Sequence, residues 1–255
     1  MAQNKNIRRK KVFLVGDTPK EKWQFFWKYY KWNALICLIG LIIFGKVVID
    51  FFTSPVLQMQ GFMLNTYNEE TDTSAEELSS DFVKAYDIDT SDGMVLLCDD
   101  WTYEPDNKDL AEESADGGRE ILIQKQKGNL DFITGYKEIM LDLAYNSLFV
   151  DLSTILSKEE MELYKPYILY MDQTVNDKLA EAYEDDKDLS SIAIPDATKP
   201  EEMDKPIPVL IDISHCNKLA NIYDNPGDSL AFGFVADAPN YEMPMDFLTF
   251  IMKED

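Results

Sequence analysis

Histidine and cysteine are scarce in this 255-residue chain, which has one histidine and three cysteines. Zinc sites draw most of their ligands from these two residue types, so the composition disfavours one. The single His215 directly follows Ser214, and adjacency in sequence does not give the geometry of a nucleophile and its base. Neither a G-x-S-x-G motif nor a phosphate-binding glycine loop occurs. We therefore expect no metal, no cofactor and no catalytic residues.

Positive charge is scarce beyond residue 52, where 14 Lys and Arg stand against 44 Asp and Glu, a net charge of −30. Such a surface repels polyanions, so nucleic acid is excluded as an expected partner. Cationic ligands and positively charged protein partners fit this part of the chain better.

One long apolar run is present, Asn33–Phe52, which is almost wholly apolar up to Gly45. At about 1.5 Å per residue it has the length of a transmembrane helix. Residues 1–32 carry nine Lys and Arg but two acids, and positive charge beside a span stays cytoplasmic. Aromatic residues from Trp23 to Trp32 suit the headgroup level of a membrane.

This pattern predicts an uncleaved signal anchor in the cell membrane, because no A-x-A-like cleavage site follows the run. The N-terminus is expected inside and the C-terminal domain outside. The expected organisation is a basic tail (1–32), a single-pass transmembrane helix (33–52), a linker (53–56) and an extracellular domain (57–255).

The extracellular domain alternates strand and helix signals, which predicts an α/β fold with a largely parallel sheet and helices on both faces. Residues 172–206 are polar and acidic and are expected to be partly extended. Gly117-Gly118 is expected to interrupt its helix. The expected strands are 57–64, 94–98, 130–134, 208–213 and 229–235, and the expected helices are 73–86, 106–128, 136–148, one beginning at the Ser157-x-x-Glu160 capping box, 217–223 and 244–253.

Two cysteines, Cys98 and Cys216, fall in the extracellular domain, and Cys37 lies in the apolar run. Each of the first two ends a predicted buried strand, so one disulfide is possible. Two buried thiols that act as small hydrophobic groups are the favoured alternative.

Candidate binding residues follow three of the predicted strands. Ligands of open α/β sheets bind beyond the carboxyl ends of the strands, so these residues are expected at one edge. Carboxylates beside aromatic rings suit a sugar, a peptide or a cation. The candidates are Asp99, Asp100, Trp101 and Tyr103 after the second strand, Gly135 and Tyr136 after the third, and Ser214 and His215 after the fourth.

The stretch from Ile123 to Tyr164 resembles a region of the type 2 periplasmic solute-binding proteins. The resemblance rests on Gly128 and Asp131 before a strand, and on Leu148, Asp151 and Leu152 before an acidic helix. It implies a ligand-binding fold. About 35 residues separate the last helix of the first lobe from the returning strand, which is too few for a second lobe. The resemblance thus implies a single lobe without a closing clamp.

The expected function is non-catalytic binding of a small ligand, a peptide or an envelope partner. One alternative is an envelope hydrolase or transferase that uses the carboxylates of Asp99, Asp100 and Asp131. Another is a scaffold for a membrane complex.

Overall fold

The computed structural model of the chain describes residues 18–53, 56–66, 75–91, 93–185, 189–220, 222–223 and 229–253. The chain divides into two compact units, residues 1–55 and residues 56–255, of which the second is hereafter the body. Parts of the predicted tail (1–17) and linker (54–55) lie outside the described residues, and so does Thr73, where the first helix of the body was expected to begin.

The described part of the first unit is one helix, α1 (Pro19–Thr53). Its first half is rich in aromatic residues that stack along the helix, with the ring centroids of Trp23 and Trp27 5.9 Å apart. Many of its large apolar side chains are exposed, among them Trp27, Trp32 and Phe44.

The prediction of a transmembrane helix at Asn33–Phe52, and with it a signal anchor, is wrong. Among the described residues, no helix combines the length and the apolar character needed to cross a membrane. The helix starts at Pro19 and includes the charged segment before Asn33. The uninterrupted apolar run between Asn33 and Lys46 covers 12 residues, about 18 Å of helix against about 30 Å of hydrocarbon.

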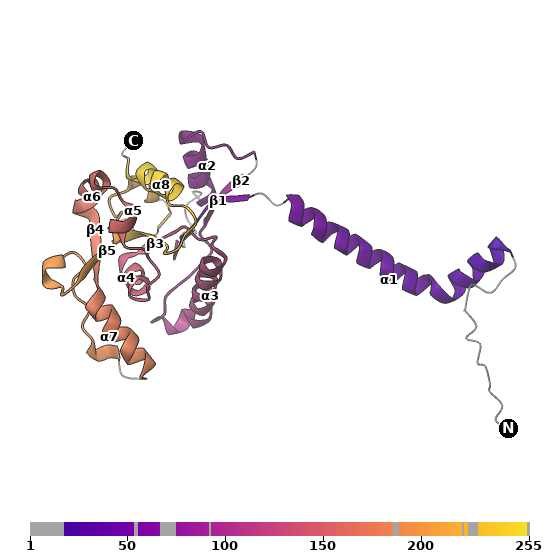
Figure 1. Ribbon diagram of the computed structural model, residues 1–255, viewed down its shortest axis with the longest axis horizontal. Coiled ribbons are helices and arrows are strands. Elements are labelled where there is room, and N and C mark those ends of the chain that lie inside the picture. The colour runs from indigo at the N-terminus through magenta and orange to yellow at the C-terminus, as the bar shows by residue number, and fades with distance from the viewer. Residues whose placement is uncertain are drawn as a thin grey trace, which may run out of the picture. The chain divides into compact units, whose positions relative to one another are not determined.

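The body is built on one six-stranded sheet with the strand order β2-β1-β3-β6-β5-β4. Figure 1 labels β1 to β5 and the helices around them. Strand β1 pairs in parallel with both β2 and β3, whereas the β3–β6, β6–β5 and β5–β4 pairs are antiparallel. The strands are β1 (Val56–Met63), β2 (Gly93–Cys98), β3 (Phe132–Tyr136), β4 (Ile168–Asp172), β5 (Pro206–Asp212) and β6 (Leu230–Phe234).

The fold is therefore mixed α/β, and the prediction of a largely parallel sheet is wrong. Parallel strands need a crossover of a dozen or more residues, usually a helix that covers the sheet. Between β5 and β6 the described residues hold only a short 3₁₀ helix, η5 (Asn217–Leu219). The chain consequently turns back, and β6 runs against both of its neighbours.

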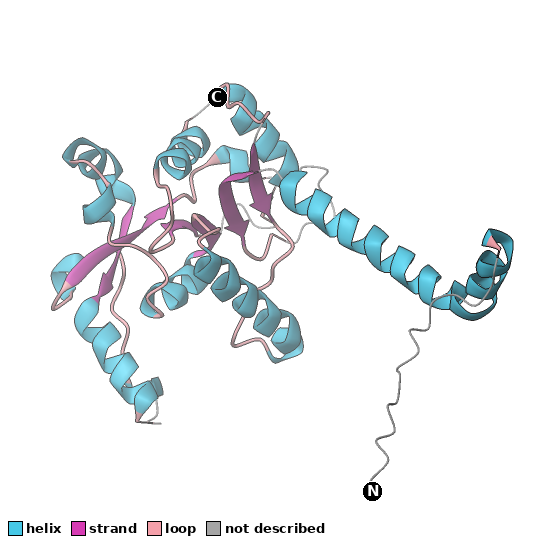
Figure 2. Ribbon diagram, turned by 45° about the vertical axis from the view of Figure 1, so that its right-hand side comes forward, coloured by secondary structure: helices cyan, strands magenta, loops and turns pink. Residues whose placement is uncertain are grey.

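Helices cover both faces of the sheet, as Figure 2 shows. Alternate strand residues point to opposite faces, so Phe132 belongs to one core and Ile133 to the other. On one face lie α2 (Ala75–Ala85), α5 (Leu152–Ile155), α6 (Lys158–Tyr164) and α8 (Glu242–Met252), and on the other lie α3 (Ala111–Lys127), α4 (Lys137–Tyr145) and α7 (Gln173–Glu184). Further 3₁₀ helices are η1 (Lys108–Leu110), η2 (Lys165–Tyr167), η3 (Leu189–Ser191) and η4 (Pro200–Glu202).

The core under α2 and α8 is rich in phenylalanine. The ring of Phe247 lies 5.0 Å from that of Phe132 and 5.3 Å from that of Phe82, measured between centroids. Phe232 also stacks on Phe132, with ring centroids 4.7 Å apart. These four side chains are fully buried, so they tie two helices and two strands together.

Local sequence signals explain several of the helix ends. The capping box predicted at Ser157 and Glu160 is confirmed, with both reciprocal hydrogen bonds at the start of α6. Helix α3 ends at Gly128, whose φ of 67° lies in the left-handed region that glycine adopts without strain. The predicted interruption at Gly117-Gly118 is wrong, because α3 continues through both glycines.

The stretch expected to be an extended, acidic excursion contains a regular helix, and a strand precedes it. Strand β4 is a short apolar run, and Asp172 then caps α7 by accepting a hydrogen bond from the amide of Thr174. Along α7, Val175, Leu179 and Ala182 recur at helical spacing; Val175 and Leu179 belong to the core under this helix, and Ala182 is buried. The many acidic residues around them make the segment polar overall, so the apolar periodicity is hard to recognise in the sequence.

Candidate functional site

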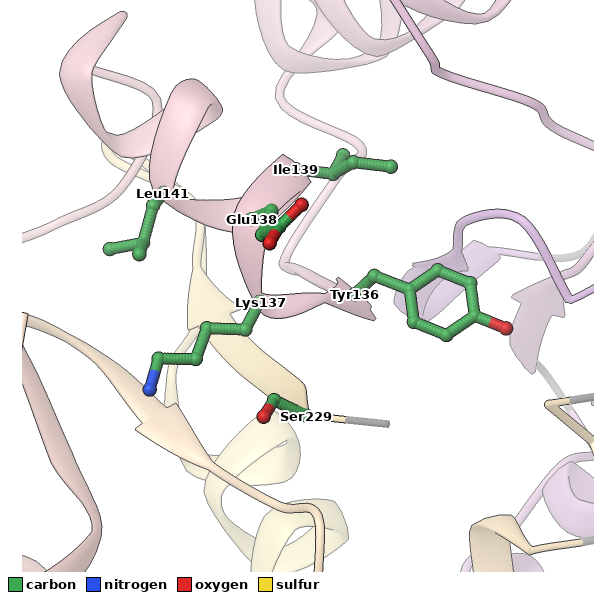
Figure 3. A pocket seen from close by; sticks show the side chains of 6 residues that line it. All are labelled: Tyr136, Lys137, Glu138, Ile139, Leu141 and Ser229. Atoms are coloured by element: carbon green, nitrogen blue, oxygen red, sulfur yellow. The ribbon is translucent and has the colours of Figure 1, made fainter. Parts of the chain in front are cut away.

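Helix α4 follows β3 without a connecting loop and forms the wall of the candidate site. Its N-cap residue, Tyr136, makes no side-chain capping bond, and the Lys137 amide donates to the Ser229 carbonyl oxygen at 2.8 Å. A first hollow of about 660 Å³ opens here, and the side chains of Tyr136 and Lys137 extend from it in opposite directions (Figure 3). Its lining is Tyr136, Lys137, Glu138, Ile139, Leu141 and Ser229.

A second hollow of about 450 Å³ adjoins the first, because both are lined by Glu138 and Ile139. The loop after β2 supplies its opposite wall. Among the described residues, its lining holds four carboxylates and no cationic side chain: Glu104, Pro105, Asp106, Asn107, Glu138, Ile139 and Asp142. One turn of helix separates Glu138 from Asp142, so both carboxylates lie on the same face of α4.

A third hollow of about 590 Å³ shares Asp142 with the second and lies between α4, α7 and the segment after α7. Its lining is Asp142, Tyr145, Asn146, Ser147, Asn176, Leu179, Ala180, Tyr183, Leu189, Ile192 and Ile194. The three hollows adjoin one another through shared residues of α4 and are together hereafter called the α4 groove. Its character changes from mixed charge through acidic to largely apolar.

The loop that supplies Glu104 and Asp106 is held in place by hydrogen bonds. The Asn65 side chain accepts from the Tyr103 amide at 2.7 Å and donates to the Tyr103 carbonyl oxygen at 3.1 Å. The Glu104 amide donates to Ser114 Oγ on α3 at 2.9 Å. A Cβ on Gly117 would lie 2.1 Å from the Thr102 carbonyl oxygen, so α3 packs directly against the backbone of this loop.

Desolvation and like charge raise the pKa of the groove's central groups. Burial raises the pKa of the Asp142 carboxyl, the nearby Asp106 adds to the rise, and a hydrogen bond from the Tyr103 hydroxyl opposes it. The same surroundings raise the pKa of Tyr103 to about 12, with burial as the main cause and Asp142 as the next. A bound cation would relieve this repulsion.

None of the four carboxylates takes part in an ion pair within the described ranges of the chain. The ion pairs of that part of the body join residues three apart on the surface, such as Asp116 with Arg119. The acidic hollow therefore keeps its charge available for a partner.

Of the sequence-predicted residues after β2, Asp99 and Trp101 have structural roles. Asp99 accepts a hydrogen bond from the Ala75 amide at the start of α2. Trp101 packs on Phe62, with ring centroids 6.3 Å apart. Tyr103 reaches the groove, since its hydroxyl donates to Asp142 at 3.2 Å. Asp100 follows Asp99 in the same loop and is exposed.

The candidates after β3 and β5 meet at one edge of the sheet, because Tyr136 pairs with Leu230 and the Leu230 amide donates to Ser214 Oγ at 2.9 Å. Tyr136 lines the first hollow. Gly135 is buried within β3. Ser214 Oγ also donates to the Asp212 carboxylate at 2.6 Å, and His215 stacks on Tyr167 with ring centroids 4.4 Å apart.

Asp131, the third carboxylate of the hydrolase alternative, lies at the opposite end of the parallel strands from Asp99. The strand register places the two residues two strands apart and three residues apart along the strands. This corresponds to about 14 Å between their Cα atoms. Asp131 is 3% exposed, and its Oδ2 accepts from the Gln60 amide at 2.7 Å. The two carboxylates do not converge on one substrate atom.

The residues behind the solute-binding resemblance serve the fold locally. Gly128 ends α3, and Asp151 caps α5 by accepting from the Ser153 amide. Leu148 and Leu152 are buried in opposite cores. None of these residues lines the α4 groove.

Cys98 and Cys216 are both free thiols and belong to different cores. The Gln60 side-chain amide donates to Cys98 Sγ at 3.7 Å. Burial raises the pKa of Cys216 to about 12. The alternative of two separate thiols is thus the one the structure adopts.

Sequence reasoning missed the carboxylates Glu104, Asp106, Glu138 and Asp142. A signal was present for two of them, because Glu138 and Asp142 are four residues apart in a helix that directly follows a buried strand. In the part of the chain that the structure describes, no cluster of three or more His, Cys, Asp or Glu has the arrangement to hold a metal ion.

Comparisons of the chain with protein-family models, curated proteins and solved structures find no match.

Proposed function

We propose that the body is a non-catalytic binding domain that holds a cationic ligand, of the size of a short peptide, in the α4 groove. The observation that carries this proposal is the acidic second hollow, with four carboxylates and no cation among the described residues that line it. An ammonium or guanidinium group placed there would neutralise charges that now repel one another.

The groove suits an elongated ligand better than a compact one. Adjoining hollows share lining residues on α4, so a ligand can lie along the helix and contact more than one of them. The body is one compact unit, which agrees with a single lobe that binds without a second lobe closing over the ligand. Solvent remains in contact with such a ligand, so the expected affinity is modest and depends on salt.

Calorimetric titration of the full-length protein with a six-residue peptide of alternating lysine and glycine tests the proposal. A peptide of the same length with glutamate in place of lysine serves as the reference ligand. We expect binding of the lysine peptide alone, and weaker binding as the salt concentration rises from 50 to 500 mM because exposed charges are screened, by about tenfold or more.

The double variant Glu138→Gln and Asp142→Asn tests whether the carboxylates of the groove bind the peptide. Removing both charges should weaken lysine-peptide binding by roughly three- to tenfold, the loss expected for two partly exposed charge contacts. The double variant Glu76→Gln and Glu159→Gln removes the same charge from exposed positions on α2 and α6 and should leave affinity unchanged. Equal losses in the two double variants would show that general charge, and not the groove, attracts the peptide.

A further inference from the structure

The third hollow gathers exposed apolar side chains more densely than the rest of the body's described surface. Six large hydrophobic residues of the described body are exposed: Val56, Leu122, Leu163, Tyr183, Leu189 and Ile194. The last three all line this one hollow, together with Leu179 and Ile192. Single exposed hydrophobic residues are common, but a cluster of them around a depression marks a binding surface.

This apolar hollow adjoins the acidic one, because Asp142 lines both. A ligand bound at the carboxylates therefore has an apolar site about one to two helical turns further along α4, roughly 6–12 Å away. An extended peptide covers that distance in two to four residues.

We infer that the α4 groove selects peptides in which a large apolar residue lies two to four positions from a lysine or arginine. This inference rests on the proposed function and names the class of peptide. The cationic side chain lies between Glu138, Asp142 and Asp106, and the apolar one lies against Tyr183, Leu189 and Ile194. Such a peptide matches the groove because its cationic side chain complements the carboxylates at one end, and its apolar side chain is buried at the other.

Two peptides distinguish this inference from the proposed function. The first is the lysine–glycine hexapeptide, and the second has one leucine in place of a glycine three positions from a lysine. We expect the leucine peptide to bind the full-length protein about tenfold more tightly, the gain from burying part of one large apolar side chain.

Variants of exposed positions then locate the gain. Tyr183→Ser and, separately, Ile194→Ser should remove most of the leucine-dependent gain, measured as the ratio of the affinities of the two peptides for the same variant. Leu122→Ser and Leu163→Ser, at exposed sites on α3 and α6, are the matched controls and should preserve the gain. All four side chains are more than half exposed, so the variants keep the fold.

Each other outcome has a distinct meaning. No binding of either peptide would overturn the proposed function together with this inference. Equal affinity for the two peptides, or loss of the gain in the Leu122 and Leu163 variants, would overturn the inference alone. Sedimentation of the unliganded protein that shows self-association abolished by Tyr183→Ser would also overturn it, because a second copy would then be the occupant.

Discussion

The two faces of the body's sheet are packed in different ways. The core under α2 and α8 has eight aromatic residues among its described buried members, whereas the core under α3, α4 and α7 has three. The first face closes over stacked rings. The second uses aliphatic side chains, and its helices leave the adjoining hollows of the α4 groove between them.

This difference separates stability from binding. Large rings that interlock fill space completely and leave no room for a ligand. Helices packed through smaller side chains such as Leu143 and Ala144 of α4 stay attached to the sheet, while their outer turns and the loops beside them shape a depression. If the two roles are separate, variants of the buried aromatic face should lose far more stability than variants of exposed groove residues.

Truncation of Phe247 should cause the largest loss of stability. Its ring is fully buried between Phe82 and Phe132, and Phe247→Ala should lower the free energy of unfolding by about 3–5 kcal/mol. The unfolding transition of the body in urea gives the free energy of unfolding and measures the change. Leu122→Ala, at an exposed position, is the control and should stay within about 0.5 kcal/mol of the unmodified protein. A loss for Phe247→Ala below 1 kcal/mol would mean that the aromatic face does not carry the stability.

Asp131 should make the body less stable as the pH rises. It is buried beside β1 and β6, its Oδ1 has no hydrogen-bond partner among the described residues, and burial raises its pKa to about 6. Because the pKa is higher in the folded than in the unfolded state, the folded state binds more protons between about pH 4 and 6. Stability is then greatest at acid pH and falls as pH rises through 6, by up to about 3 kcal/mol.

The variant Asp131→Asn isolates this effect, since an amide oxygen can still accept from the Gln60 amide. We expect the free energy of unfolding of the variant to fall less between pH 4 and 7 than that of the unmodified protein. Urea unfolding at half-unit pH steps measures both curves. Parallel curves would show that Asp131 titrates alike in the folded and unfolded states.

Gly117→Ala should destabilise the groove face by about 1–3 kcal/mol, the usual cost of overpacking. The added Cβ would overlap the Thr102 carbonyl oxygen, a backbone atom that cannot rotate away. Gly118→Ala is a matched control in the same helix, because its Cβ would meet only the Tyr103 ring, at 3.1 Å. The measurement is the free energy of unfolding of each. Similar losses in both variants would show that helix–loop contact at Gly117 is not the cause.

Tyr183→Ser should change stability least. Its side chain is 79% exposed on α7, so the free energy of unfolding should move by less than about 0.5 kcal/mol. Thermal unfolding followed by circular dichroism checks this. A larger loss would place Tyr183 in the support of the fold and weaken the separation between a stabilising face and a binding face.

Local sequence patterns predicted the position of most elements of the body. The capping box at Ser157 and the apolar runs of β2 and β5 depend on neighbours in sequence, and such neighbours are visible without a fold. Strand direction was missed because β6 is set by how the chain returns after η5, which depends on contacts distant in sequence. Helix α7 was missed because its acidic surface outweighed a short apolar stripe.

The candidate site was harder to predict than the fold. The rule that ligands bind at strand ends led to Tyr103 and Tyr136, which do border the α4 groove. It also led to Asp99, Ser214 and His215, whose side chains are engaged in capping, turn or stacking contacts. Residue type cannot show whether a polar group binds the protein itself or faces solvent.

The charge imbalance of the chain and the periodicities that form helices and strands can be read from the order of the residues, because these properties belong to single residues and their near neighbours. The mixed sheet and the α4 groove depend instead on contacts between distant parts of the folded chain. Glu104 and Asp106 come from a loop more than thirty residues away from Glu138 and Asp142, and only the packing of α3 and α4 on one face of the sheet brings them around a common hollow.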